Sequence, residues 1–507
     1  MDNYNLDTSL YAAIDLGSNS FHLIVIRKTD DKIQVIDSHK EMIRLRSGLD
    51  DKGYLTEKAF ESGINCLAKF GQLLNNIPEN QVRAVGTNTL RNAKNSRDFI
   101  EQAEDALGHD IDIVTGEEEA RLIFLGVSHG LAKADKQHLI IDIGGGSTEF
   151  IIGENFKHKH LTSTEMGCVS ISQLFFKNGK ISDLSTSKAI NHCRRILKPH
   201  SKTLIKKGWQ EAVGASGSIK SIGNLLKENA LTEGEITLKG MQSIKKKLIE
   251  AGSTKDAMSQ GLKGLKEERL PVFIGGLAIL IAAFQELKIK SMQVSTSALR
   301  EGLIYDNLGR LNQKDVREAS VTRLQSWLKV DEQHAERITK TALQLLENYR
   351  KDSKLKCIHL SFSKLLAWAA KLHEGGISIS YKRYRYHSAY LVKNAELSGF
   401  SQQEQQILSA MVLNHQGKLN MKSFDGFNKK QQKNLIRLTL LLRLSVLLHR
   451  DREGDDIDCQ LSFKNEQVIL AFQQRWLDEH PLTYEDLEAE AKQYQQLGLE
   501  LHIREHA

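Results

Sequence analysis

The chain has 507 residues, of which 40% are hydrophobic and 26% are charged, as expected for an ordinary folded protein with more than one domain. Its 70 Lys and Arg residues exceed the 63 Asp and Glu residues only mildly, so net charge alone does not indicate an anionic partner. The five cysteines are scattered without a C-x-x-C pair, which argues against a disulfide or zinc framework.

The N-terminal residues are polar and acidic, which argues against a signal peptide. The longest apolar runs, 272–284 and 435–448, are shorter than the roughly 18 residues needed to span a bilayer. We therefore expect both runs to be buried helices, and the protein to be cytoplasmic without a membrane span.

The first predicted element is a β-hairpin at residues 11–25, YAAIDLGSNSFHLIV, and a similar segment recurs at residues 138–152, HLIIDIGGGSTEFII. Each consists of a β-rich run, a turn of small residues and a second β-rich run, and Asp15 aligns with Asp142. Backbone amides in such a turn can bind an anion, and the aspartate can hold hydrated Mg²⁺. The repeat predicts two similar lobes with a phosphate held between them.

An acidic segment, TGEEEARLIF at 115–124, lies between the two hairpins. Its glutamates Glu117, Glu118 and Glu119 follow a small turn and precede apolar residues. They suit the positive end of a helix dipole, and one of them could instead orient an attacking water as a general base. Spacing alone does not say which.

Two further small-residue segments follow. VGASGS at 213–218 is a third candidate phosphate loop. IGGLAIL at 274–280 places two glycines before an apolar stretch, so its amides could face an anion at the start of a helix, or the glycines could permit close helix packing.

Beyond about residue 306, glycine becomes rare and helical periodicity dominates. Apolar residues at Ile338, Ala342, Leu345, Leu346 and Tyr349 share one helical face. Further helices are predicted at 362–373, 387–396, 403–415 and 431–449.

Basic residues alternate with aromatic ones in YKRYRYH at 381–387, and further basic residues occur at 428–434 and 435–443. Such stretches could be solvated loops, could bind nucleic acid, or could line a track for a long polyanion such as polyphosphate.

Taken together, the motifs resemble the long form of the exopolyphosphatase and guanosine pentaphosphate phosphohydrolase family. The matching strings are DLGSNSFH at 15–22, TGEEEARLIF at 115–124, DIGGGSTEF at 142–150, MGCVS at 166–170, VGASGS at 213–218 and ALREG at 298–302.

The resemblance implies an α/β fold with two actin-, Hsp70- and sugar-kinase-like lobes, at residues 1–126 and 127–306. A helical HD-like domain would follow at 307–450, and a small C-terminal domain at 451–507. The implied activity is Mg²⁺-dependent removal of the terminal phosphate from inorganic polyphosphate or guanosine pentaphosphate, linked to the stringent response. A cytoplasmic homodimer that binds no specific nucleic acid is also implied.

The resemblance also implies roles for individual residues. Glu119, the last glutamate of the E-E-A-R string, corresponds to the catalytic base, and Asp142 and Glu149 correspond to residues at the metal ion and the attacking water. The residues implied to bind substrate are Asp15, Ser18, Asn19 and Ser20 in the first loop, Gly145, Gly146, Ser147 and Thr148 in the second loop, and Gly214, Ser216 and Gly217 in the third. Arg91 of the T-x-T-L-R string corresponds to an arginine that binds the phosphate chain.

Some departures from the family pattern leave choices open. The string before ALREG, often Gly-rich in the family, here carries Ser295 and Ser297. An HD domain needs a His-Asp pair, whereas this chain has His373 followed by Glu374, so this region is either a second metal site or a degenerate scaffold. Family-like strings point towards both substrates, so the preferred one stays open.

Two functions of other classes compete with the hydrolase. The hairpins could bind ATP in an actin- or Hsp70-like switch module. A sugar kinase would use an aspartate base and show sugar-contact residues, and no such signature is evident. The basic C-terminal stretches could belong to a nonspecific polyanion-binding protein.

Overall fold

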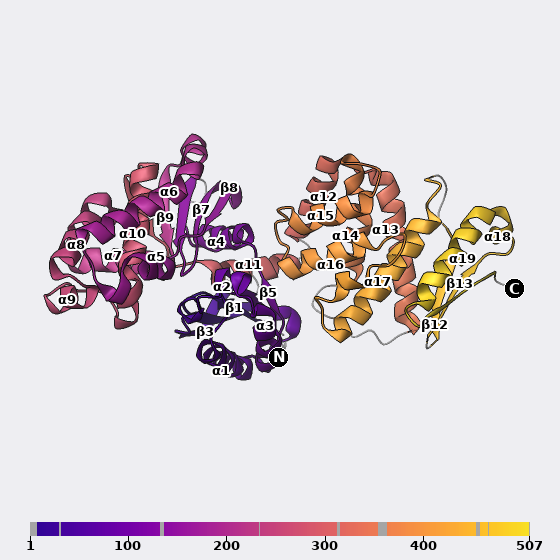
Figure 1. The fold of residues 1–507 in the computed structure, drawn as a ribbon, viewed down its shortest axis with the longest axis horizontal. Coiled ribbons are helices and arrows are strands. Elements are labelled where there is room, and N and C mark those ends of the chain that lie inside the picture. Colours follow the sequence, from indigo (N-terminus) through magenta and orange to yellow (C-terminus); the bar gives the residue numbers. More distant parts are fainter. Residues whose placement is uncertain are drawn as a thin grey trace, which may run out of the picture. The chain divides into compact units, whose positions relative to one another are not determined.

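The computed structural model describes the chain in two compact units, Met1–Asp315 and Val316–Ala507, which are considered separately (Figure 1). The residues described are 8–29, 32–131, 136–232, 234–311, 315–352, 362–452, 457–464 and 466–505.

The first unit contains two sheets whose strands follow the same order. In the five-stranded sheet the order is β3-β2-β1-β4-β5, and the six-stranded sheet has the order β8-β7-β6-β9-β11-β10. In each, an antiparallel hairpin is extended by a third antiparallel strand on one side and a parallel strand on the other. The strands are β1 (Thr8–Leu16), β2 (Phe21–Thr29), β3 (Lys32–Glu41), β4 (Val82–Gly86), β5 (Ile111–Ile113), β6 (His138–Ile143), β7 (Thr148–Glu154), β8 (Lys157–Thr164), β9 (Glu211–Ala215), β10 (Ile236–Thr237) and β11 (Ser291–Val294).

The two sequence segments predicted as hairpins pair β1 with β2 and β6 with β7. The last pairs are Leu16 with Phe21 and Ile143 with Thr148, so each tip is a four-residue turn. Both turns consist of glycine, serine and asparagine only, which lets other backbone approach them closely.

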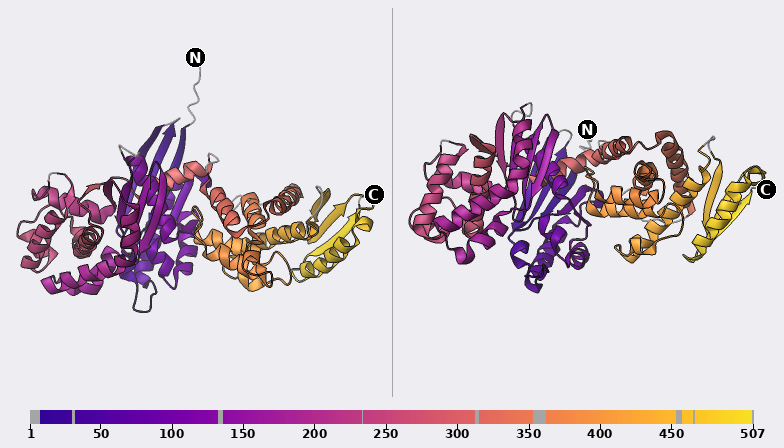
Figure 2. Two further views of the ribbon diagram at one scale, coloured as in Figure 1. Left: turned by 90° about the horizontal axis from the view of Figure 1, so that it is seen from above. Right: turned by 45° about the horizontal axis from the view of Figure 1, so that its top comes forward.

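Helices cover and join the two sheets, which lie side by side (Figure 2). α11 packs on β1, α4 packs on β7 and β8, and α4 and α11 pack on each other. The helices are α1 (Glu57–Leu74), α2 (Asn88–Asn92), α3 (Ser96–Leu107), α4 (Gly116–Gly130), α5 (Cys168–Phe175), α6 (Asp183–Lys207), α7 (Ser216–Glu228), α8 (Leu238–Ala251), α9 (Thr254–Ser259), α10 (Leu270–Leu287) and α11 (Leu299–Leu311), with short 3₁₀ turns at Leu45–Gly48, Glu79–Gln81, Lys177–Gly179 and Glu267–Arg269.

Two glycines allow α4 and α11 to touch backbone to backbone. A Cβ atom on Gly302 would lie 1.8 Å from the carbonyl oxygen of Leu122, and one on Gly126 would lie 2.1 Å from that of Ala298. A buried ionic network reinforces the contact, since Arg121 of α4 forms ion pairs with Glu118 of the same helix and with Asp306 of α11. The two helices are therefore held in one fixed relation.

The apolar segment at 272–284 forms α10, as predicted, and it lies in the core. Among the described residues one helical stretch, Glu267–Leu287, has the length and hydropathy of a membrane span, but 78% of its apolar 18-residue segment is buried inside the protein. The hypothesis that Gly275 and Gly276 lie at the start of a helix, where their amides could bind an anion, is wrong, because both lie inside α10. They serve close packing instead: a Cβ on Gly275 would lie 2.3 Å from the Cys168 carbonyl oxygen.

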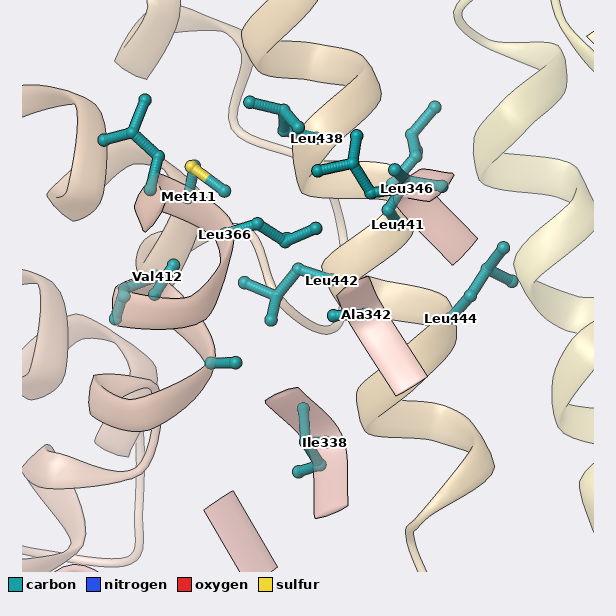
Figure 3. Packing of buried hydrophobic residues seen from close by; sticks show 14 of the residues in the cluster. Ile338, Ala342, Leu346, Leu366, Met411, Val412, Leu438, Leu441, Leu442 and Leu444 are labelled. Carbon is teal, nitrogen blue, oxygen red and sulfur yellow. The ribbon is translucent and has the colours of Figure 1, made fainter. Parts of the chain in front are cut away.

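The second unit is mainly helical, as the periodicity predicted. Side chains of α13, α14, α16 and α17 point towards one another in its core (Figure 3). Capping boxes at Ser401 and Asn428 place the starts of α16 and α17 one to two residues earlier than predicted. The helices are α12 (Val316–Leu328), α13 (Glu332–Asp352), α14 (Phe362–Leu372), α15 (Tyr384–Asn394), α16 (Gln402–Leu413), α17 (Lys429–Leu448), α18 (Trp476–Glu479) and α19 (Pro481–Gln495), with 3₁₀ turns at Gly375–Ser378 and Met421–Phe424.

A three-stranded sheet, β12 (Cys459–Lys464), β13 (Gln467–Phe472) and β14 (Glu500–Glu505), completes this unit. Its inward residues Leu470 and Phe472 belong to the same hydrophobic cluster as Trp368 of α14. One continuous core therefore runs through the helices and the sheet.

Candidate active site

The two hairpin tips meet in the first unit. A Cβ atom on Gly145 would lie 2.9 Å from the Cβ of Ser18 and 3.4 Å from the amide nitrogen of Asn19. The tips border a cavity of about 260 Å³, which both hairpins and the start of α7 help to line. Of the residues expected at the site, those lining it are Asp15, Ser18, Asn19, Ser20, Glu119, Asp142, Gly145, Ser147, Ser216 and Gly217.

Four acidic side chains gather here: Glu119 and Asp142 are buried and Asp15 is partly buried at the cavity, and Glu149 is buried behind it. Burial raises the pKa of Asp15 to about 8, with repulsion from Glu119 adding to the shift, and burial and Glu119 raise the pKa of Asp142 to about 7. The pKa values of Glu119 and Glu149 are raised for the same first reason, burial. Oδ1 of Asp15 and Oε2 of Glu149 are buried without a hydrogen-bond partner among the described residues. Such oxygens fit a hard divalent cation, which would supply the missing positive charge.

Glu119 lies in the first turn of α4, whose N-cap Thr115 accepts a hydrogen bond from the amide of Glu118. This turn aims the neighbouring carboxylates in different directions: Glu118 pairs with Arg121, whereas Glu119 lines the cavity. Nη1 of Arg91 lies 3.0 Å from Oε2 of Glu119 and favours its ionised form against burial. The structure thus distinguishes the glutamates that spacing could not.

The third small-residue segment turns from β9 into α7. Ser216 adopts a left-handed backbone conformation with φ of 78°, a strained geometry for a residue other than glycine. It opens α7, whose first amides lack partners within the helix and can bind an anion. A Cβ on Gly217 would lie 1.9 Å from Nη2 of Arg269, so a larger residue here would displace that guanidinium from its present position.

Five basic side chains that the sequence analysis did not assign also line the cavity: His22, Lys40, Lys220, Arg269 and Arg300. Arg300 belongs to the ALREG string, and Lys220 lies two residues after the third loop, so motif position could have indicated both. Lys40 and Arg269 come from segments without a motif, and only the fold brings them to the site.

Several residues expected to contact substrate do not line the cavity. Arg91 bonds Glu119 and the Val114 carbonyl instead. Thr148 is fully buried and its hydroxyl donates to the Met166 carbonyl. Gly146 packs against Asn88, and Gly214 packs against Ile219 and Met292. These residues pack behind those that line the cavity.

Glu149 also lies behind the cavity. It pairs across the hairpin with Asp142, and its Oε1 accepts a hydrogen bond of 2.9 Å from Ser163. Its second oxygen is the unpartnered one, so it remains available to a cation.

Comparison with known proteins agrees with this arrangement. The Ppx/GppA phosphatase family matches residues 24–311, and domain III of Ppx/GppA phosphatase matches residues 316–491. Curated proteins from Pseudoalteromonas translucida (strain TAC 125) and Aeromonas salmonicida (strain A449), both named guanosine-5'-triphosphate,3'-diphosphate pyrophosphatase, are 38% and 36% identical to this chain. Both alignments cover 97% of this chain and 98% of the relative.

Solved structures show the same fold for part of the chain. An exopolyphosphatase from Cytophaga hutchinsonii aligns with a TM-score of 0.54 and 24% identity, over 60% of this chain and 98% of that one. The Ppx/GppA family member of Aquifex aeolicus aligns with a TM-score of 0.52 and 23% identity, over 60% and 99%. On the evidence of the family match and the near full-length relatives, the chain belongs to the Ppx/GppA phosphatase family.

Proposed function

We propose that this protein is a hydrolase that removes the terminal phosphate of guanosine-5'-triphosphate,3'-diphosphate, and that inorganic polyphosphate is a second substrate. The observation that carries the proposal is the cavity itself, where three carboxylates, one of them Asp15 with an unpartnered oxygen, face basic side chains. A terminal phosphate needs both features, since its own charge must be neutralised and its attacking water must be oriented. The names of the near full-length relatives support the guanosine substrate.

Magnesium is the proposed cofactor, held by Asp15, Asp142 and Glu149. It would neutralise charge on the phosphate oxygens and act as a Lewis acid. The unpartnered oxygens of Asp15 and Glu149, and the mutual repulsion of the acids, support a cation here.

The chain's own groups account for binding and water activation. Backbone amides of the two tips and the start of α7 bind the phosphate oxygens, and Lys220, Arg269 and Arg300 balance their charge. Glu119 acts as the general base that orients the attacking water, with Arg91 holding its carboxylate in place.

The larger organisation is also proposed. The matching strand order of the two sheets supports two copies of one actin-like lobe, at residues 1–126 and 127–306. We assign residues 307–450 to an HD-like helical domain and 451–507 to a C-terminal element. We further propose a cytoplasmic homodimer with a role in the stringent response.

The proposal is tested by measuring phosphate release from guanosine-5'-triphosphate,3'-diphosphate, polyphosphate and ATP with Mg²⁺. Turnover of either of the first two without ATP turnover is expected, whereas turnover of ATP alone would favour the switch-module alternative. Glu119→Gln should lower kcat by about 10² or more while substrate binding persists. Glu117→Gln, on the same helical turn but away from the cavity, is the matched control. Equal rates for Glu119→Gln and the control would refute the base assignment.

A further inference from the structure

Two histidines and a glutamate meet in the second unit, far along the sequence from the motifs of the first. His334 lies in the first turn of α13, His373 follows α14, and Glu374 caps the 3₁₀ turn at Gly375–Ser378. One ligand atom from each of the three lies within 4.8 Å of the other two. His334 and His373 are 3% and 1% exposed, so water does not solvate their imidazoles freely.

Both imidazoles present a nitrogen that has no hydrogen-bond partner among the described residues. These atoms are Nδ1 of His334 and Nε2 of His373. A buried polar nitrogen left unpaired costs free energy, roughly 1–3 kcal/mol on general grounds, and such groups are rare in folded proteins. Two such nitrogens on neighbouring histidines, whose ring centroids lie 6.2 Å apart, call for a shared partner.

The hydrogen bonding of His373 fixes which nitrogen is free. Its Nδ1 lies 2.7 Å from the Ala370 carbonyl oxygen, which can only accept, so Nδ1 carries the proton. Nε2 therefore presents a lone pair. This is the arrangement found in metal-ligating histidines, where the other ring nitrogen donates to a carbonyl or carboxylate that sets the tautomer.

Glu374 supplies the carboxylate of the cluster. Its Oε1 accepts a hydrogen bond from Arg452, whose guanidinium is partly exposed. The carboxylate is thereby oriented, as ligating carboxylates usually are by outer hydrogen bonds. One carboxylate oxygen of Glu374 completes a set of two nitrogens and one oxygen.

We propose that His334, His373 and Glu374 bind one divalent first-row transition-metal ion, such as Zn²⁺, Co²⁺ or Ni²⁺. Imidazole ligands suit these ions, whereas Mg²⁺ prefers oxygen ligands throughout. Around a tetrahedral ion with bonds of about 2.0–2.1 Å, the ligand atoms lie about 3.4 Å from one another. The three atoms here lie within 4.8 Å of one another, so the side chains need to move only a little to bind the ion.

The ion keeps an open side. His334 and Glu374 line a cavity of about 610 Å³, together with Tyr384, His415 and Arg443. A set of two histidines and one glutamate with a free position is the arrangement of open zinc sites, in which water or a ligand completes the coordination. The ion also links the start of α13 to the end of α14, so it stabilises this unit.

Cobalt binding to the full-length protein tests the site. Metal-free protein is titrated with Co²⁺ in excess Mg²⁺, which occupies the oxygen-only site of the first unit. We expect one Co²⁺ per chain with visible absorption typical of nitrogen coordination, and a higher melting temperature on binding. His334→Gln and His373→Gln should each weaken binding by more than about 10-fold, since even outer partners of metal ligands are worth that much.

His502→Gln is the matched control, because His502 is a half-exposed histidine of the same unit outside the cluster. Circular dichroism of the metal-free proteins checks that each variant folds. If the histidine variants do not fold, Glu374→Gln, which keeps both imidazoles, must weaken Co²⁺ binding instead. Absence of a Co²⁺ spectrum in the wild type, or unchanged affinity in the folded variants, would overturn the proposal.

Discussion

A single methyl group between α4 and α11 should disturb the candidate active site from a distance. In Gly302→Ala, the new Cβ would lie 1.8 Å from the carbonyl oxygen of Leu122. Carbon and oxygen atoms in ordinary contact lie at least about 3.4 Å apart, so the helices must separate by roughly 1.5 Å. α4 carries Glu119 and the first turn of α11 carries Arg300, so this shift changes the distance between the proposed base and a proposed phosphate-binding arginine.

The expected change in the free energy of unfolding follows from two opposing effects. Overpacking costs typically about 1–3 kcal/mol, and replacing glycine by alanine inside a helix returns up to about 1 kcal/mol. We expect a net loss of about 1–2 kcal/mol and a melting temperature lower by a few degrees. A displacement near 1 Å at a catalytic group lowers the rate about 10²-fold. We therefore expect kcat to fall steeply although the protein stays folded.

The assay compares thermal unfolding and phosphate release for Gly302→Ala and a matched control, Gly426→Ala. A Cβ on Gly426 meets nothing within 4 Å and its φ is not left-handed, so the control should match the wild type. Wild-type kcat in a well-folded Gly302→Ala protein would refute the claim that this helix contact sets the site.

Three further predictions concern charge. Because the pKa of Asp15 is raised from 3.8 to about 8, the folded state binds more protons than the unfolded state between these values, so metal-free protein should lose stability as pH rises through this window. Thermal melts in chelator should show a shallower loss for Asp15→Asn, and an identical slope would contradict the assigned burial. Arg300→Ala should lower kcat/KM by about 10²–10³, the size of losing one charge-stabilising donor, whereas Arg97→Ala on an exposed face of α3 should not; steady-state kinetics on both variants decides this. Reversing the charges of Lys382 and Arg383 should slow hydrolysis of long polyphosphate more than that of guanosine-5'-triphosphate,3'-diphosphate, and equal losses on the two substrates would count against a polyanion track.

Local pattern was sufficient for much of the fold. Alternating and small residues predicted the hairpins at 11–25 and 138–152, because a tight turn and a half-buried strand each need particular residue types over a few positions. Helical periodicity likewise predicted α13 to α17, with errors of a few residues where caps such as Asn428 decide the start.

Pattern misled where one local string suits two environments. The glycines at 275 and 276 suit an anion-binding helix start as well as close packing, and only the neighbours across the contact, Cys168 and Ser172, distinguish the two. Thr148 and Gly214 belong to phosphate-loop strings, yet their side-chain positions point into packed interior.

The amino-acid sequence by itself determined the hairpins, the acidic first turn of α4 and the family. Only the tertiary structure decided that Glu119, and not Glu118, lines the cavity, and that Lys40 and Arg269 join it. It also brought His334 to His373 and Glu374. The physical reason is that neighbours along the chain set strand and helix geometry, whereas charge balance in a cavity depends on which distant side chains the packing brings together.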